Sequence, residues 1–256
     1  MPVKAPPPLP APINSWTGWY VGANVGGGWG HRDVSFTPND PIAAQIVPPP
    51  QSFTTSGVVG GLQLGYNWRL QPNWLLGFET DFDWSGMSGS STAAYDFLGI
   101  IPFTSTVDED VKWFGTVRGR LGWLPWNNLL IYGTGGFAYG RVNHTGSLSS
   151  PGLAINVIGG PGFSCGSTLN GTTPCFAGSS GNTATGWTAG GGVEYALWQQ
   201  WSLKLEYLYV RLASNGLTET ALSVPFPGLN TPASFKANFS HTNFNVVRVG
   251  LNYQFH

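Results

Sequence analysis

Apolar and polar side chains alternate with a period of two along several stretches of this chain, and this alternation restricts its fold most strongly. In one stretch, Trp74, Phe78 and Trp84 stand at alternate positions. Glu79 and Asp81 occupy the positions between them. Neighbouring side chains on a β-strand point to opposite faces. Such stretches therefore predict strands with one apolar face and one polar face.

Eight stretches of about 11–13 residues show this pattern, a length that suits tilted strands crossing the apolar band of an outer membrane. The predicted strands are residues 18–30, 57–69, 74–86, 111–123, 129–141, 185–197, 201–212 and 243–255. Three connections between them have about two to four residues, and the other four have about 25, 25, 40 and 30. Short connections that alternate with long ones predict an antiparallel up-and-down arrangement, with three turns at one end and four long loops at the other.

A soluble β-sandwich would also show alternating strands, with its polar faces in water. Here only 9% of residues are charged, against about 25% in soluble domains, and the polar faces hold mostly Gly, Thr and Asn. No run of about 18 apolar residues predicts a membrane-spanning helix. The apolar faces also begin and end in aromatic residues, which mark the two interfaces of a membrane. The predicted aromatic girdle comprises Trp19, Trp74, Trp84, Trp113, Trp123, Trp201, Tyr253 and Phe255. We therefore expect an all-β fold, an eight-stranded antiparallel up-and-down transmembrane β-barrel.

The chain divides into two parts. Residues 1–15 are rich in proline and predict an extended tether, and residues 16–256 contain the predicted barrel with its four long loops. The start of the chain has no basic and apolar export signal, so we expect that the signal peptide has been removed on maturation or that this start lies downstream of it. In a Gram-negative outer membrane, the tether, both termini and the short turns would be periplasmic, and the long loops would be extracellular.

Ten charged residues fall on the predicted inward faces, five acidic and five basic. They are Glu79, Asp81, Asp83, Lys112, Arg118, Arg120, Glu194, Lys204, Glu206 and Arg248. An eight-stranded barrel is wide enough only for side chains to fill it, and buried charges require partners. The balance predicts a luminal network of salt bridges. Two alternatives, a narrow ion path and a proton-shuttling pair of carboxylates, both need water in the lumen.

The two cysteines, Cys165 and Cys175, lie in a stretch rich in Gly, Ser, Thr and Asn. A lone close pair in an exported protein predicts a disulfide in an extracellular loop. Metal ligation is the weaker alternative, because no histidine or second cysteine pair stands nearby. We expect no metal and no cofactor.

The histidines allow two interpretations. His31, His144 and His241 are predicted in loops or at strand rims outside, where they are either solvated or accessible to hemin or a metal ion. A lipid-modifying enzyme would need a catalytic group at the membrane edge. The one nearby pair, Ser240 and His241, is adjacent in sequence, so its side chains would point apart on a strand. We expect no enzymatic activity.

Four predicted strands closely resemble those of small outer-membrane proteins of alphaproteobacteria, often labelled "porin family" and distantly related to the OmpA barrel. These strand segments are residues 16–26, 111–122, 203–209 and 247–255. The resemblance covers all the predicted strands and none of the loops. It implies a surface-exposed barrel that supports envelope integrity, and some family members have been proposed to bind hemin. The family usually ends on an aromatic residue, whereas here His256 follows Phe255.

Two functional hypotheses follow. The first is a structural surface protein, and the second is a small pore or a surface receptor for hemin or another ligand. Expected partners are outer-membrane lipid, lipopolysaccharide, the barrel-assembly machinery and, through the tether, peptidoglycan or another periplasmic molecule. A formal charge of −1 argues against nucleic acid, which needs a clustered basic surface.

Overall fold

A computed structural model describes most of the chain. The described residues are 16–41, 43–97, 99, 101–150, 154–155, 163–164, 167–168, 171–172, 174–198, 200–213, 216–221 and 233–255. The proposed tether, residues 1–15, lies outside them, as do Cys165 and His256. No helix among the described residues is long and apolar enough to cross a membrane.

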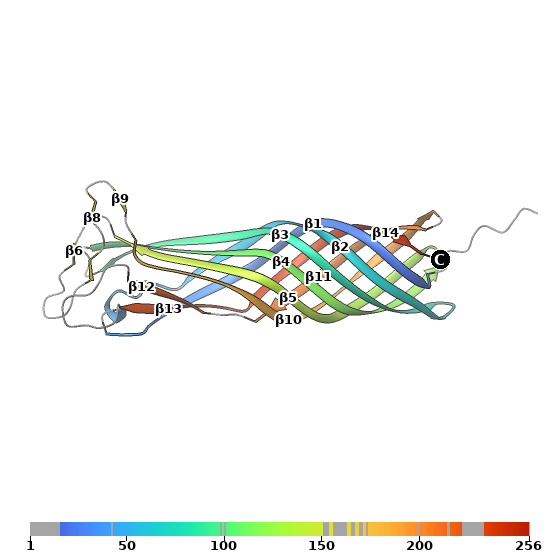
Figure 1. The fold of residues 1–256 in the computed structure, drawn as a ribbon, viewed down its shortest axis with the longest axis horizontal. Coiled ribbons are helices and arrows are strands. Elements are labelled where there is room, and N and C mark those ends of the chain that lie inside the picture. The colour runs from blue at the N-terminus through green and yellow to red at the C-terminus, as the bar shows by residue number, and fades with distance from the viewer. Residues whose placement is uncertain are drawn as a thin grey trace, which may run out of the picture.

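Eight long strands close into a ring in the described part of the chain, which confirms the predicted barrel. Each strand pairs antiparallel with the next, and the last pairs with the first through Val25 and Val249. In ring order the strands are β1 (Gly18–Pro38), β2 (Gln51–Gln71), β3 (Trp74–Phe97), β4 (Ile101–Trp126), β5 (Leu129–Ser149), β10 (Pro174–Trp198), β11 (Trp201–Leu212) and β14 (Thr242–Gln254). Figure 1 shows these strands side by side and tilted against the long axis of the barrel.

Several strands continue far beyond the ends that the sequence predicts. β3 was expected to end near residue 86, but it runs to Phe97, and β4 begins at Ile101 rather than near residue 111. A hairpin of β12 (Leu217–Ala221) and β13 (Ser234–Phe239) pairs with β10 and β1 and completes the extended part of the wall. In Figure 1 these extensions run nearly along the long axis, away from the short turns.

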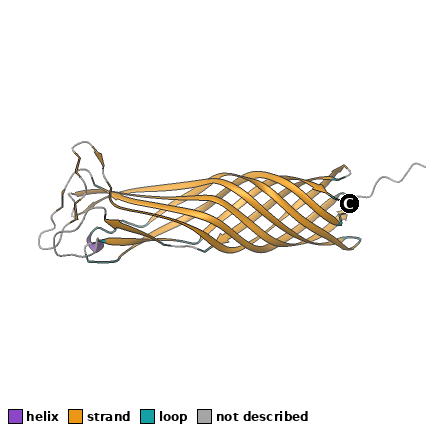
Figure 2. Cartoon of the chain, in the orientation of Figure 1, coloured by secondary structure: helices purple, strands orange, loops and turns teal. Residues whose placement is uncertain are grey.

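We call the end with the short turns the turn end and the opposite one the loop end. The stalk is the extended wall at the loop end, made of residues 31–38, 51–55, 85–97, 101–111, 142–149, 174–184, 217–221 and 234–239. Smaller elements at the loop end are the 3-10 helix η1 (Ala43–Gln45) and the two-residue strands β6 (Ala154–Ile155), β7 (Phe163–Ser164), β8 (Ser167–Thr168) and β9 (Gly171–Thr172). Strand dominates throughout (Figure 2).

The barrel wall is apolar outside. Val25, Leu62 and Leu205 are each about half exposed, whereas the residues between them point inward. Every girdle residue predicted from the sequence lies on this outer face. Neighbouring strands align these rings, because Trp74 is the register partner of Trp123 near the turn end. A second aromatic belt, which we call the loop-end belt, lies at the base of the stalk and comprises Trp29, Trp84, Trp113, Tyr139, Trp187 and Tyr209.

Candidate functional site: the filled lumen

Apolar and charged or polar layers of side chains alternate along the interior of the barrel. The inward residues of β4 contribute to each of these layers in turn. From the turn end, Leu124 belongs to an apolar cluster, and Arg120 and Arg118 belong to a charged layer. Phe114 belongs to a second apolar cluster, and Glu109 to a polar layer in the stalk. Two further apolar clusters follow towards the loop end.

Nine of the ten charged residues predicted inside lie in the charged layer, and each is at most 3% exposed. Lys112 does not join them, so its assignment was wrong. The register shifts between Val111 and Trp113, and a β-bulge there turns Lys112 to the outer surface, where it pairs with Asp110 at 3.1 Å. The layer therefore has five acidic and four basic residues.

Arg118 is one centre of this network. Its guanidinium donates to Glu79, to Asp81 Oδ2 at 2.8 Å and to Glu206 Oε1 at 3.1 Å. Glu79 is the register partner of Arg118 on β3, whereas Glu206 lies on β11, three strands away around the ring. Arg118 therefore joins the near wall to a distant one.

Arg248 on β14 is the second centre. Its guanidinium donates to Asp83 Oδ2 at 2.6 Å, to Asp81 Oδ2 at 2.5 Å and to Glu206 Oε2 at 2.7 Å. Planar guanidinium groups suit such multiple carboxylate contacts. Because Asp81 and Glu206 contact both arginines, the two centres form one network.

Two tyrosine hydroxyls complete the charged layer, and no feature of the sequence assigned them to it. Tyr20 donates to Glu79 Oε2 at 2.6 Å, and Tyr132 donates to Glu206 Oε1 at 2.8 Å. Arg120 lies over the Tyr132 ring, 3.7 Å from its centroid. Tyr20 lies so close over β2 that a Cβ at Gly65 would be 2.3 Å from the phenol, so this approach requires glycine.

Several contacts span the full width of the lumen. Lys204 on β11 donates to Glu79 on β3 at 2.9 Å, and these strands lie opposite each other in the ring. One layer higher, Phe114 on β4 and Phe244 on the opposite strand β14 meet edge to face, with ring centroids 5.2 Å apart. An ionic layer and an apolar layer thus occlude the barrel in series.

A buried polar layer crosses the stalk, and no sequence signal identified it. Arg32 on β1 donates to Glu109 Oε1 on β4 at 2.5 Å, and both side chains are fully buried. His144 lies 3.5 Å from Glu109 and packs against Phe239. The predicted exposed position of His144 was wrong, because β5 continues to Ser149 and directs residue 144 inward. Burial and the Arg32 charge lower the pKa of His144 to about 4, so it is neutral at physiological pH.

Glu219 on β12 is a buried acid inside the stalk. It is fully buried, and neither carboxyl oxygen forms a hydrogen bond within the described part of the chain. Burial raises the pKa of Glu219 to about 8, and burial and the Glu219 charge raise the pKa of nearby Tyr95. The folded stalk therefore holds Glu219 in its neutral form at pH 7.

We expect alkaline pH to loosen the stalk around β12. The folded pKa of Glu219 is raised, so its contribution to stability is complete below pH 4.5 and is lost as the pH rises towards 8. The loss should reach a few kcal/mol, because one pKa unit corresponds to about 1.4 kcal/mol. Hydrogen exchange of β12 and β13 amides between pH 5 and 9, corrected for intrinsic rates, should show decreasing protection. Glu219→Gln should abolish this decrease, whereas Asp110→Asn, an exposed control, should retain it. Equal pH dependence in wild type and Glu219→Gln would contradict the assignment.

The Cys165–Cys175 disulfide remains a prediction, because Cys165 lies outside the described residues. Cys175 is buried in an apolar cluster at the loop end. We expect no reactive thiol in the non-reduced, mature protein. A disulfide that closes a loop this short should add about 2–3 kcal/mol at most to local stability. The predicted loop position of Cys175 was wrong, because Cys175 lies at the loop-end start of β10. The barrel should still fold in Cys165→Ser with Cys175→Ser, because this part of β10 belongs to the stalk and not to the wall between the aromatic belts. Labelling of two thiols in unreduced wild type would refute the disulfide.

Comparison with known proteins decides the family. The family model described as "Outer membrane protein beta-barrel domain" matches residues 8–255. The chain belongs to this family. A 31 kDa outer-membrane immunogenic protein of Brucella melitensis is 36% identical over 252 residues, covering 98% of this chain and 89% of the relative. A 22 kDa outer membrane protein of Rhizobium leguminosarum is 27% identical, covering 77% of this chain and 65% of that protein.

Among solved structures, OprG from Pseudomonas aeruginosa is similar, with a TM-score of 0.46 and 9% identity, covering 94% of this chain and 97% of OprG. The outer membrane protease OmpT from Escherichia coli has a TM-score of 0.43 and 10% identity, covering 96% of this chain and 99% of OmpT. The sequence relatives agree with the resemblance to alphaproteobacterial outer-membrane proteins. The protein is an outer-membrane β-barrel.

Proposed function

We propose that this barrel is a structural surface protein that supports envelope integrity, conducts no ions and has no enzymatic activity. The contacts across the lumen carry this proposal, above all Phe114 against Phe244 and Lys204 against Glu79. A hydrated pore would need a continuous polar path. The described interior instead alternates apolar and ion-paired layers, and its charged side chains are occupied by one another.

In the proposed orientation, the turn end faces the periplasm and the loop end faces the exterior. Short turns and the C-terminus gather at one end of the ring (Figure 1), as in outer-membrane barrels generally. The stalk would then raise the loop end above the membrane. β3 continues from Trp84 to Phe97, which at about 3.3 Å per residue corresponds to roughly 40 Å of strand. Barrel-assembly machinery and a periplasmic partner of the tether remain proposed contacts.

Planar-bilayer recordings test the closed lumen. We expect the refolded full chain to give no stable current steps at moderate voltage, while a general porin in the same bilayer does. Insertion should be verified by protease protection of the barrel. Reproducible steps of defined size from the inserted wild type would reject the proposal and favour the small pore.

A second candidate, a ligand receptor at the stalk surface, rests on one groove of about 470 Å³. Asp33, Gln51 and Ser240 are among its lining residues. His31 contacts Asp33, and His241 follows Ser240, so two exposed imidazoles flank this groove. A hemin titration followed by absorbance tests it. Binding lost in His31→Ala with His241→Ala would support a receptor, and an unchanged hemin spectrum would exclude this ligand.

A further inference from the structure

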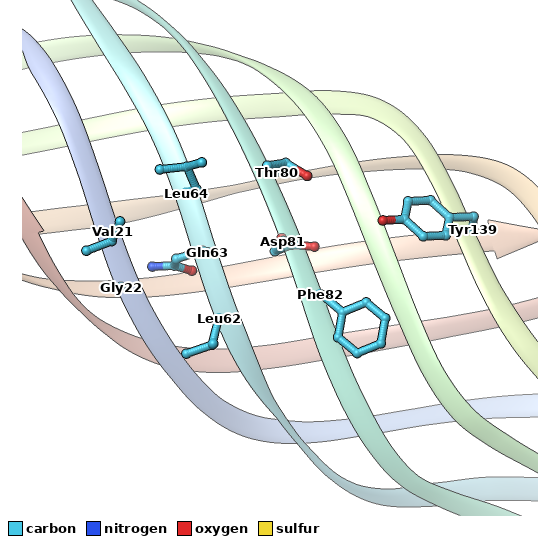
Figure 3. Close-up of a pocket in the computed structure, with 9 residues that line it drawn as sticks. All are labelled: Val21, Gly22, Leu62, Gln63, Leu64, Thr80, Asp81, Phe82 and Tyr139. Carbon is cyan, nitrogen blue, oxygen red and sulfur yellow. The ribbon is translucent and has the colours of Figure 1, made fainter.

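An apolar groove of about 590 Å³ runs across the outer wall of the barrel, within the size range of ligand sites. Figure 3 shows Val21 at one end, Tyr139 at the other and Thr80 between them. The remaining lining residues are Gly22, Leu62, Gln63, Leu64, Asp81 and Phe82. Gln63 and Asp81 themselves point into the lumen, so side chains such as Leu62 and Phe82 make the exposed lining apolar.

The groove connects the two aromatic belts. Val21 is two residues beyond Trp19 of the turn-end girdle, whereas Tyr139 lies in the loop-end belt. Two neighbouring rows of register partners span the groove, because Leu64 is the partner of both Val21 and Thr80, and Gly115 is the partner of both Phe82 and Tyr139. The strands are tilted, so a path along their register climbs from one side of the membrane towards the other.

A small side chain and a glycine form the floor of the groove. Thr80 turns its hydroxyl to the backbone and donates to Thr116 O at 3.0 Å. On β4, a Cβ at Gly115 would lie 2.7 Å from the Tyr139 phenol, so the missing side chain lets the Tyr139 ring lie down across that strand. In Figure 3 the Tyr139 hydroxyl points towards Thr80 and Asp81. It forms no hydrogen bond with any residue that the structure describes.

Two exposed cations stand above the Tyr139 end. Arg141 is two residues beyond Tyr139 on the same outward face, and it is the register partner of Trp113. Lys112, which the β-bulge turns outward, immediately precedes Trp113. Asp110 neutralises part of this charge through its contact with Lys112, whereas Arg141 has no ion pair among the described residues. A positive site therefore lies where the apolar groove reaches the membrane interface.

We propose that this surface binds one outer-leaflet lipid that carries phosphate on its headgroup. The phosphate contacts Arg141 and Lys112, and one acyl chain lies in the groove across Thr80. Charge complementarity selects the headgroup, because guanidinium and ammonium groups bind phosphate strongly. The apolar lining selects a hydrocarbon chain within the bilayer. The groove lies on the outer wall, so this inference does not depend on whether the lumen is closed, but the outer-leaflet placement rests on the orientation proposed above.

The test measures lipid retained by the full chain in detergent micelles, using native mass spectrometry. The probe is a bisphosphorylated, multiply acylated glucosamine lipid, with its dephosphorylated form and inorganic phosphate as separate arms. We expect one tightly retained lipid per wild-type chain. Lys112→Gln with Arg141→Gln should weaken retention tenfold or more, since two cations near an anionic lipid surface together contribute about 2 kcal/mol and about 1.4 kcal/mol corresponds to tenfold. Thr80→Phe, which fills the groove, should weaken it too. Lys236→Gln, an exposed stalk cation, should leave it unchanged.

Heat-modifiable gel migration verifies that each variant is folded. The substituted cations are exposed and Thr80 lines the outer groove, so all variants should fold. Equal retention by wild type and the double variant, or equal retention of the dephosphorylated lipid, would overturn the headgroup site. Full displacement by inorganic phosphate, together with unchanged binding by Thr80→Phe, would show an anion site without a chain groove and would also overturn the proposal. A dimer that Thr80→Phe dissociates, with no lipid bound, would assign the groove to a second copy of the chain.

Discussion

Arg118→Ala should destabilise the barrel by about 3–5 kcal/mol, the usual cost of removing one partner from a buried ionic network. Glu79, Asp81 and Glu206 all accept hydrogen bonds from this guanidinium. Its removal leaves five buried acids with three bases, and water cannot easily solvate them in the packed lumen. Urea unfolding in detergent, followed by gel migration, measures the change. Planar-bilayer recordings of the same variant should detect any ion current through the lumen, because the apolar layer around Phe114 would then be the remaining barrier to ions.

Two further substitutions make this result specific. Arg118→Glu should destabilise more than Arg118→Ala, because it adds another acid to the surplus. Lys112→Ala should cost less than about 1 kcal/mol, because Lys112 forms a solvent-exposed pair with Asp110. A neutral Arg118→Ala with no leak would show that the network is dispensable. Wild-type conduction combined with a neutral Arg118→Ala would indicate a wet channel.

Arginine on the outer wall should oppose insertion. Leu205 and Val249 are register partners on β11 and β14, and both are about half exposed midway between the aromatic belts. Leu205→Arg or Val249→Arg should each cost about 2–4 kcal/mol, the range measured for Arg at mid-bilayer. Reversible folding into lipid vesicles, monitored by gel migration against urea, gives the difference directly.

Substitutions at the same site, on the stalk and in the lumen supply the controls for this prediction. Leu205→Ala should cost much less than Leu205→Arg, and Ser35→Arg, on the exposed stalk, should be nearly neutral. Asn252→Arg should behave differently, since Asn252 points inward and donates to Glu194 at 2.7 Å. Its effect should depend on charge pairing in the lumen. Equal tolerance of Arg and Ala at both Leu205 and Val249 would mean that these residues do not face lipid.

The strand alternation was enough to predict the barrel, because it is a local pattern. On β3, an apolar face from Trp74 to Trp84 and an acidic face from Glu79 to Asp83 could be recognised without knowing any partner strand. The same pattern placed nine charged residues correctly inside. Pairing across the lumen could not be predicted, because Lys204 reaches Glu79 through the closure of the ring.

The stalk was missed for a different reason. From Ser88 to Ala94, β3 consists of Ser, Gly, Thr and Ala, whose small side chains give no clear apolar face. Such a stretch has the composition of a loop, and its strand character comes from pairing with β4 up to Phe97. The same omission hid the buried position of His144 and the enclosed carboxyl of Glu219. The bulge at Lys112 was likewise invisible, because one extra residue becomes evident only against a partner strand.

At that bulge, the alternation of inward and outward residues along β4 shifts by one position. From Phe114 to Leu124 the inward residues of β4 have even numbers, whereas from Phe103 to Val111 they have odd numbers. Deleting Lys112 would remove the bulge and leave a regular alternation with Glu109 still inward, whereas deleting Asp110 while the bulge is kept would turn the stalk half beyond it inside out, with Glu109 facing solvent. The bulge at residue 112 therefore determines which residues in the stalk part of β4 point inward. Away from the bulge itself, insertions or deletions in pairs should lengthen or shorten the stalk during evolution, whereas single ones should be excluded.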